Sequence, residues 1–368
     1  DIHNQRWMTG VRLAATDLLD GLLDTSISAS FSELVRGYRD NDGWSRNDRF
    51  TGQTTQYSWQ STLHLHERVN LTVGIDQVHE SAEVRDGGMP AWFIPASVPV
   101  NDRHRTNAAF AQLQVEPIND LFLNGGVRWN HHSVFGEEWT YSAAAAYHIE
   151  DTGTRLKTSI GKSYRAPSLY ELFEPTYGMA GLQPETGTSW DVGFEQDLCE
   201  GSITFGSTYF RNRVTDYIGF DLATYRYGQI NGIKTHGVET FVRVQPIPTV
   251  AMQLTHTYQH TNSMESESSP IAYRPGQKGS ADITWRPCEG RIRLNLNGIY
   301  VGTQETVDGG GAAKLADYTL VNAAASYQLN DYVELYVRAE NLLNASYETV
   351  PNYNEYGRTY YVGTSVSF

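Results

Sequence analysis

Residues 360–368 read Tyr-Tyr-Val-Gly-Thr-Ser-Val-Ser-Phe and close the sequence. The even-numbered positions carry mostly large side chains, and the odd-numbered positions after Tyr361 carry small or polar ones. A period of two indicates a β-strand, because successive side chains of a strand point to opposite faces. An aromatic such as Phe368 at the very end is typical of the closing strand of an outer-membrane barrel. The last strand of a soluble sandwich is the alternative.

The same alternation recurs along the chain. Residues 69–76, 121–130, 291–300 and 332–340 each place apolar side chains on one face and polar ones on the other. Two further strands are expected at 7–19 and 23–35, around a short turn. In a soluble sandwich the apolar face would point inward, whereas in a barrel surrounded by lipid it points outward.

Connection length separates these two alternatives. Short turns are expected near residues 20, 67, 117, 151, 199, 247, 288 and 330, and longer loops near residues 42, 92, 134, 174, 223, 268, 309 and 349. This alternation is typical of outer-membrane barrels, which have short periplasmic turns and long external loops. We therefore expect an all-β fold, a transmembrane antiparallel β-barrel, with about 17 strands and residues 1–368 as a single domain. An odd strand number also predicts that further strands precede Asp1, because bacterial single-chain barrels have even numbers.

Composition excludes two other classes of protein. The net charge of -14 and the pI near 5.2 argue against nucleic-acid binding, which needs a basic face. The mean hydropathy of -0.45 and the lack of a helix-length apolar run exclude a helical membrane protein. The 23 Tyr and 8 Trp suit the aromatic girdles of a barrel in outer-membrane lipid. Two cysteines are too few for a disulfide framework.

Several ordered motifs occur from residue 100 onward. They include an aromatic-Arg-Ala-Pro segment, a Leu-x-Pro-Glu segment, a strand glycine, an Asn-Leu pair and a terminal Gly-Arg to Phe block. Their central residues are Arg165, Ala166, Pro167, Pro184, Glu185, Gly193, Asn341, Gly357 and Phe368. In order and spacing these motifs resemble the barrel of TonB-dependent outer-membrane receptors. One departure is Asp191, where that family usually has Glu.

The resemblance implies the missing parts and the function. It implies a barrel of about 22 strands, an amino-terminal plug domain and a box that contacts the TonB complex, and both plug and box are absent from residues 1–368. It also implies location in the bacterial outer membrane and active import of a scarce nutrient, without catalysis. Residues 353–363 are similar to the ending of vitamin B12 (cobalamin) receptors, which favours cobalamin as the nutrient. A ferric-siderophore receptor is the alternative, and a passive porin is favoured less because it would not keep the Arg-Ala-Pro to Pro-Glu spacing.

Aromatic side chains of the external loops are the candidate ligand contacts, because they could stack on a planar macrocycle or a catecholate. The alternative is that they anchor the loops at the membrane interface. The candidates are Trp92, Phe93, Tyr170, Tyr177, Tyr225, Tyr227, Tyr353 and Tyr356, together with Arg358 at the rim.

No cofactor is required by this hypothesis, and one metal site is considered. Asp40 and Asp42 lie in an Asp-Asn-Asp-Gly stretch that resembles half of a calcium loop. The stretch lacks the third acidic ligand and the downstream Glu, so it predicts a weak Ca²⁺ site at most. The adjacent His131 and His132 point to opposite faces of a strand and cannot chelate a metal alone.

Overall fold

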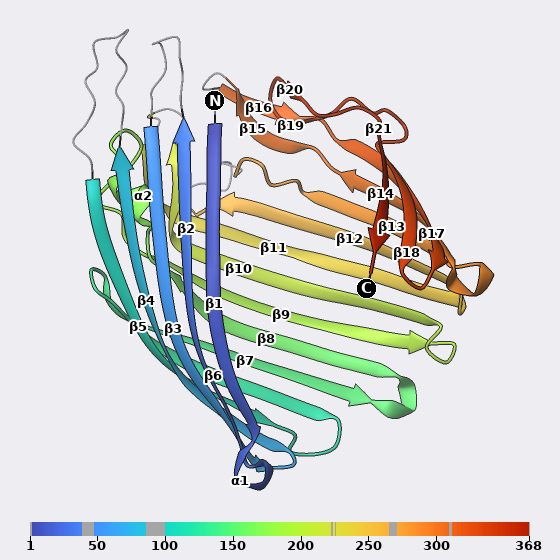
Figure 1. Ribbon diagram of the computed structural model, residues 1–368, viewed down its shortest axis with the longest axis horizontal. Coiled ribbons are helices and arrows are strands. Elements are labelled where there is room, and N and C mark those ends of the chain that lie inside the picture. The colour runs from blue at the N-terminus through green and yellow to red at the C-terminus, as the bar shows by residue number, and fades with distance from the viewer. Residues whose placement is uncertain are drawn as a thin grey trace. The chain divides into compact units, whose positions relative to one another are not determined.

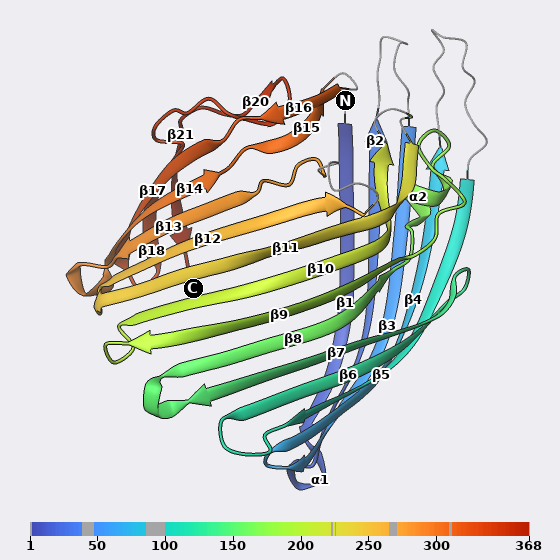
Figure 2. The ribbon, with the colours of Figure 1, turned by 180° about the vertical axis from the view of Figure 1, so that it is seen from behind.

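The computed structural model describes residues 2–38, 48–85, 100–221, 224, 226–264, 271–308 and 311–367. Seventeen strands in this part of the chain form one sheet (Figures 1 and 2), which agrees with the expected number. They are β1 (Ile2–Asp17), β2 (Leu23–Tyr38), β3 (Asp48–His66), β4 (Val69–Arg85), β5 (Val100–Val115), β6 (Leu121–His132), β7 (Gly136–Ile149), β8 (Thr154–Arg165), β9 (Glu185–Leu198), β10 (Ile203–Asp221), β11 (Arg226–Ile247), β12 (Val250–Ser263), β13 (Gln277–Trp285), β14 (Ile292–Val301), β17 (Tyr318–Asn330), β18 (Val333–Glu340) and β21 (Thr359–Val366).

Two small hairpins accompany the sheet. One pairs β15 (Gln304–Asp308) with β16 (Gly311–Leu315), and the other pairs β19 (Glu348–Val350) with β20 (Tyr353–Asn354). Among the described residues, no helix has both the length and the apolar run that crossing a membrane requires.

The chain divides into two compact units, which we describe separately. Unit 1 comprises residues 1–145, 159–188 and 214–232, and unit 2 comprises residues 146–158, 189–213 and 233–368. In unit 1, β1 to β6 pair antiparallel in chain order. In unit 2, β12, β13, β14, β17, β18 and β21 also pair antiparallel in that order. That residues 1–368 form a single domain stays a prediction.

Three of the short turns have a common backbone geometry. Leu19, Asp20 and Gly21 of the helical turn α1 (Leu18–Gly21) have φ values of 56°, 58° and 83°. The Cys-Glu-Gly turns at 199–201 and 288–290 (3-10 helix η3) repeat these values within a few degrees, and both cysteines are free and exposed. Glycine takes the largest positive φ in each turn, because it lacks the Cβ that disfavours the left-handed region.

Two of the expected long loops are short, so the strict alternation of short and long connections was wrong. Only residues 133–135 separate β6 from β7, and only residues 222–225 separate β10 from β11. The first connection is tight because Gly136 has a φ of 75° and because His132 Nδ1 accepts hydrogen bonds from the backbone N–H of Val134 and Phe135. At the second connection the strands continue through the predicted loop, since β10 has 19 residues and β11 has 22.

The alternating residues at the end of the chain form strand β21, as predicted, and β21 pairs with β18. Tyr361 lies opposite Arg338, whose guanidinium carbon is 4.4 Å from the centre of the tyrosine ring. Val362, on the other face, is 84% exposed. Phe368 lies outside the described residues.

The packing of β9 against β10 requires the motif glycine Gly193. A Cβ atom at this position would lie 2.4 Å from Thr208 Oγ1 and 2.9 Å from the Ser207 carbonyl oxygen. In the structure, the space is taken by the neighbouring strand.

Candidate binding site

The segment between β8 and β9 begins with the Arg-Ala-Pro motif and carries the short helix α2 (Leu169–Phe173). Pro167, which lacks a backbone N–H, is buried just beyond the end of β8. Ser168 caps α2, because its side chain accepts a hydrogen bond from the Glu171 backbone N–H and the Glu171 carboxylate accepts one from the Ser168 backbone N–H. This reciprocal capping satisfies two backbone donors at the start of the helix.

Charged side chains of the two motifs tie α2 to the sheet. Arg165 Nη1 donates to both carboxylate oxygens of Glu171 at 3.0 and 3.1 Å, and Arg165 Nε donates to Glu185 Oε2 at 2.6 Å. The other oxygen of Glu185 accepts a hydrogen bond from the Ile218 backbone N–H at 2.6 Å. Glu171 and Glu185 are only 13% and 12% exposed, so Arg165 compensates two largely buried carboxylates. The Arg-Ala-Pro to Pro-Glu spacing therefore has a structural role in unit 1.

The helix brings aromatic rings together in what we call the α2 aromatic cluster, defined as Phe50, Tyr170, Tyr177, Phe220 and Tyr227. Its edge-to-face pairs have ring centroids 5.2 Å apart for Phe50 and Tyr170, 6.2 Å for Tyr170 and Tyr227, 5.4 Å for Phe220 and Tyr227, and 5.8 Å for Tyr177 and Phe220. These separations and orientations are those preferred by aromatic pairs. Leu172, Leu182 and Ile218 form a buried apolar core, and Tyr227 of the cluster packs against it.

Backbone contacts hold the cluster in place. The backbone N–H of Tyr227 donates to the Tyr177 carbonyl oxygen at 2.7 Å. Glu174, which is 5% exposed, accepts hydrogen bonds from the backbone N–H groups of Thr176 and Tyr177. Burial, with the nearby Glu174 carboxylate as a smaller contribution, raises the pKa of Tyr170 to about 12. The Tyr170 hydroxyl is therefore a neutral hydrogen-bond donor at physiological pH.

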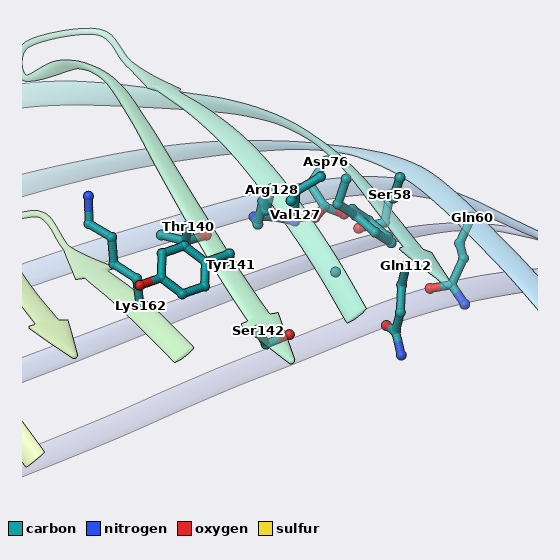
Figure 3. A pocket seen from close by; sticks show the side chains of 13 residues that line it. Ser58, Gln60, Asp76, Gln112, Val127, Arg128, Thr140, Tyr141, Ser142 and Lys162 are labelled. Atoms are coloured by element: carbon teal, nitrogen blue, oxygen red, sulfur yellow. Dashed lines mark hydrogen bonds and ion pairs between the residues drawn. The ribbon is translucent and has the colours of Figure 1, made fainter. Parts of the chain in front are cut away.

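A second feature of unit 1 is a polar hollow of about 470 Å³ on one face of the sheet (Figure 3). Arg128 donates to Asp76 Oδ2 at 2.6 Å and to Asn130 Oδ1 at 2.9 Å, and its guanidinium lies 5.6 Å from the centre of the Phe110 ring. Ser58, Gln60 and Gln112 line the same hollow. The charge of Arg128 is compensated within the wall, which suits a solvated inner surface more than a charged ligand site.

Two buried histidines of unit 1 lie close together. His104 is 4% exposed, His132 is 2% exposed, and their ring centroids are 4.9 Å apart. The Nε2 atoms of both rings lack a hydrogen-bond partner among the described residues. Because His132 Nδ1 accepts two backbone N–H groups, its proton is on Nε2, which then has no lone pair for a metal. Within the described parts of the chain there is no cluster of three or more potential metal ligands.

The segment between β18 and β21, residues 341–358, belongs to unit 2, and we call it the carboxy-terminal loop. Asn341, which is 4% exposed, holds this loop together. Its side-chain Nδ2 donates to the carbonyl oxygens of Ala345 and Tyr356, and its Oδ1 accepts from the Ala345 backbone N–H. Gly357 lies close to this network, since a Cβ there would be 2.8 Å from Asn344 Oδ1, which accepts a hydrogen bond from the Arg358 backbone N–H. Tyr353 and Tyr356 project from this loop and are 72% and 87% exposed.

The structure thus brings together three of the predicted contacts, Tyr170, Tyr177 and Tyr227. Tyr353, Tyr356 and Arg358 lie in the other unit, on one exposed loop. Trp92, Phe93, Tyr225, Asp40 and Asp42 lie outside the described residues. That any of these residues contacts a ligand, or that Asp40 and Asp42 bind Ca²⁺, stays a prediction.

Sequence reasoning missed Phe50 and Phe220, which complete the α2 aromatic cluster, and it missed His104. Both phenylalanines lie near strand ends, Phe50 at the third residue of β3 and Phe220 at the next-to-last residue of β10. The only sequence signal that could have identified these two phenylalanines was their position next to predicted loops. Their pairing with Tyr170 and Tyr227 depends on long-range strand order, which single-sequence periodicity does not contain.

The family model for the β-barrel of TonB-dependent receptor-like proteins matches residues 1–342. Among solved structures, the chain is similar to the copper transporter OprC, with a TM-score of 0.81 and 16% identity over 99% of this chain and 66% of that chain. It is also similar to the siderophore receptor PirA from Acinetobacter baumannii, with a TM-score of 0.79 and 15% identity over 99% and 63% of the two chains.

A third similar structure is a mutant of the ferric enterobactin receptor PfeA from Pseudomonas aeruginosa, with a TM-score of 0.75 and 17% identity over 99% and 70% of the two chains. At these identities the likeness shows the fold alone, and the chain spans less than two thirds of the first two proteins. The family model covers nearly the whole sequence, and this family consists of transport receptors of the outer membrane. This chain therefore belongs to the TonB-dependent receptor β-barrel family.

Proposed function

We propose that this protein is an integral outer-membrane receptor that binds a scarce nutrient at the cell surface and imports it with energy supplied through the TonB complex. The observation that carries the proposal is the α2 aromatic cluster, which the Arg165, Glu171 and Glu185 network holds at the end of β8 in a barrel of this family. A rigid group of rings with a neutral Tyr170 hydroxyl suits a ligand that offers flat surface and hydrogen-bond acceptors.

Two nutrient classes have support. Cobalamin is favoured by the similarity of residues 353–363 to the ending of cobalamin receptors. A ferric siderophore is supported by the siderophore and ferric enterobactin receptors among the similar structures. Both ligands present planar or aromatic groups, so both fit the exposed tyrosines of the carboxy-terminal loop and the α2 aromatic cluster.

Equilibrium binding to the complete detergent-purified protein discriminates these classes. Cyanocobalamin, with and without Ca²⁺, is compared with a ferric catecholate siderophore. Submicromolar binding of one ligand assigns the substrate, and a Ca²⁺ requirement that is lost in Asp40→Asn/Asp42→Asn supports the weak calcium site. Binding of neither ligand would reject both nutrient classes.

Variants then connect binding to residues. Tyr356→Ala is expected to weaken binding about two- to tenfold, because one aromatic contact contributes about 0.5–1.5 kcal/mol. Tyr332→Ala, which removes a 64% exposed tyrosine from a short turn, is the matched control and should leave affinity unchanged. Uptake by cells should also require TonB, and uptake that persists without TonB would support a passive pore instead.

A further inference from the structure

The last residue of β6 holds the connection from β6 to β7. His132 is 2% exposed, and its Nδ1 atom accepts hydrogen bonds from the backbone N–H groups of Val134 and Phe135, at 3.2 and 3.3 Å. These two bonds satisfy the backbone donors of two of the three residues in the connection, 133–135. An imidazole accepts a hydrogen bond only through a nitrogen that carries no proton. The connection is therefore held by the neutral form of His132.

His104 of β5 packs against the same connection. Its ring is 4% exposed, lies edge to face with the His132 ring at a centroid separation of 4.9 Å, and is 6.3 Å from the Phe135 ring. Because the pairing of β5 with β6 ends where Thr106 lies opposite His132, His104 is at the level of the connection itself. The histidine pair therefore lies where these strands end, outside the part of the barrel wall that spans the membrane.

The histidine pair also supports helix α2. The ring of Phe173, the last residue of α2, lies 6.2 Å from the His104 ring with an angle of 70° between the planes. Phe135 and Phe173 both pack against the buried apolar core that Tyr227 of the α2 aromatic cluster also contacts. A continuous series of contacts therefore joins His132, through Phe135 and this core, to Tyr227.

A second proton on His132 is incompatible with this arrangement. It would occupy Nδ1, so both backbone N–H groups would lose their acceptor and a charge would be buried. Burial, with repulsion from His104 and His131 as smaller causes, lowers the pKa of His132 to about 4. Burial also lowers the pKa of His104, against the opposing effect of Asp102 and Glu80. The packing therefore selects the neutral form of both rings.

The other charged side chains on the elements packed against the pair have partners or are exposed. Among the described residues, Glu138 of β7 binds Lys162, Glu171 of α2 binds Arg165, and Glu174 accepts backbone N–H groups. Arg103, Arg105 and Glu137 are exposed, and the two arginines flank His104 and lie on the opposite face of β5. Acid therefore acts on this region through the histidine pair.

We propose that protonation of His132 releases the β6–β7 connection and, through Phe135, the α2 aromatic cluster, so that the cluster is fixed in neutral medium and freed in acid. His132 is then a positioning residue, which acts on the cluster without touching a ligand. A receptor at the cell surface meets the pH of the medium directly, and a ligand bound by the cluster would be held less tightly in acid. The inference rests on the proposed function for this use alone, since the movement does not depend on which nutrient is imported.

Hydrogen–deuterium exchange of the complete detergent-purified protein, without ligand, measures the release at two pH values after correction for intrinsic amide exchange. A histidine in an opened segment has a pKa of about 6.5. The closed segment is therefore fully stabilised above that pH and loses stability as the pH falls towards the folded-state pKa of about 4. Residues 133–135 and 169–178 should exchange about thirtyfold faster at about pH 5 than at about pH 7.5, with no comparable change in β14.

His132→Asn separates the charge from the hydrogen bonds. The asparagine oxygen accepts backbone N–H groups but does not titrate, so exchange of both segments should differ by less than about threefold between the two pH values. The matched control is His131→Asn, which removes the adjacent histidine on the opposite face of β6, where its ring stacks 5.9 Å from Trp129. This control should keep the thirtyfold dependence, and so should His104→Phe, which retains an aromatic ring.

Three results would overturn the proposal. The first is equal exchange of the two segments at both pH values in the parent protein, which is decisive even if a variant does not assemble. The second is loss of the pH dependence in His131→Asn as well as in His132→Asn. The third is its loss in His104→Phe together with its retention in His132→Asn, which would assign the titration to His104. Because no ligand is present, failure of this inference and failure of nutrient binding are read separately.

Discussion

Removing the Arg165 guanidinium is the most direct test of how the α2 segment is held. In Arg165→Gln, the Glu171 and Glu185 carboxylates lose three charge-assisted hydrogen bonds while they remain 13% and 12% exposed. Hydrogen bonds to charged groups contribute about 1.5–3 kcal/mol each when buried. Arg165 itself is 44% exposed, so solvent screening reduces the total to about 2 kcal/mol for local opening of the segment.

Hydrogen–deuterium exchange of the detergent-solubilised protein measures this local opening. A change of about 2 kcal/mol predicts about thirtyfold faster exchange of amides in residues 166–184, with little change in β3 or β4. Arg165→Lys should recover only part of the protection, because an ammonium cannot engage two carboxylates through a planar fork.

The matched control is Arg338→Gln, which breaks an ion pair with Glu340 in which the two side chains are 51% and 43% exposed. Exposed pairs contribute little, so this variant should not change exchange in β18 by more than about threefold. Unchanged exchange of residues 166–184 in Arg165→Gln would refute the role of Arg165. A double-mutant cycle with Glu185→Gln that gives simple additivity would refute the direct coupling of these two motif residues.

Three further predictions concern other motif residues. Gly193→Val should block assembly of the barrel, seen as loss of heat-modifiable gel migration, because the new side chain has no room beside Thr208, whereas Gly125→Ala has open space and should assemble normally. Asn341→Ala should make residues 342–358 about tenfold more sensitive to protease, since buried backbone groups lose their partners, while Asn354→Ala at an exposed position should not; equal sensitivity of the two variants would contradict the role of Asn341. The raised pKa of Tyr170, about 12 in the folded protein, predicts that its contribution to stability is full below pH 10 and declines as the pH rises towards 12; the absorbance difference between the parent and Tyr170→Phe should titrate above pH 11, and a midpoint near 10 would contradict burial of this hydroxyl.

Local alternation was sufficient to predict most of the sheet. The strand at 69–76 became part of β4, and the terminal alternation became β21, because each residue's face is fixed by its neighbours in sequence. Periodicity did not predict the short connection at 133–135, where the His132 ring replaces loop residues as the partner of two backbone N–H groups. Periodicity also did not predict where β10 and β11 end. A polar loop and a polar strand end contain the same types of residue, so the sequence does not separate them.

The candidate site was predicted only in part for a related reason. Tyr170, Tyr177 and Tyr227 were singled out as loop aromatics, but their convergence depends on strand order and on the turn at α2. Phe50 joins them from a strand more than a hundred residues earlier in the sequence. In the sequence, Arg165 and Glu185 could be recognised only as parts of two motifs at a fixed spacing. Their contact could not be predicted, because the segment between them contains a helix and turns whose path the sequence does not specify.

The length of one side chain limits how this part of the receptor can change. Glu185 uses one carboxylate oxygen for Arg165 at the end of β8 and the other for the Ile218 backbone in β10, each at 2.6 Å. An aspartate would withdraw both oxygens by about 1.5 Å, the length of one carbon–carbon bond, and could restore one contact only by abandoning the other. Glu185 therefore joins β8, β9 and β10 through two contacts that an aspartate at this position could not make at the same time.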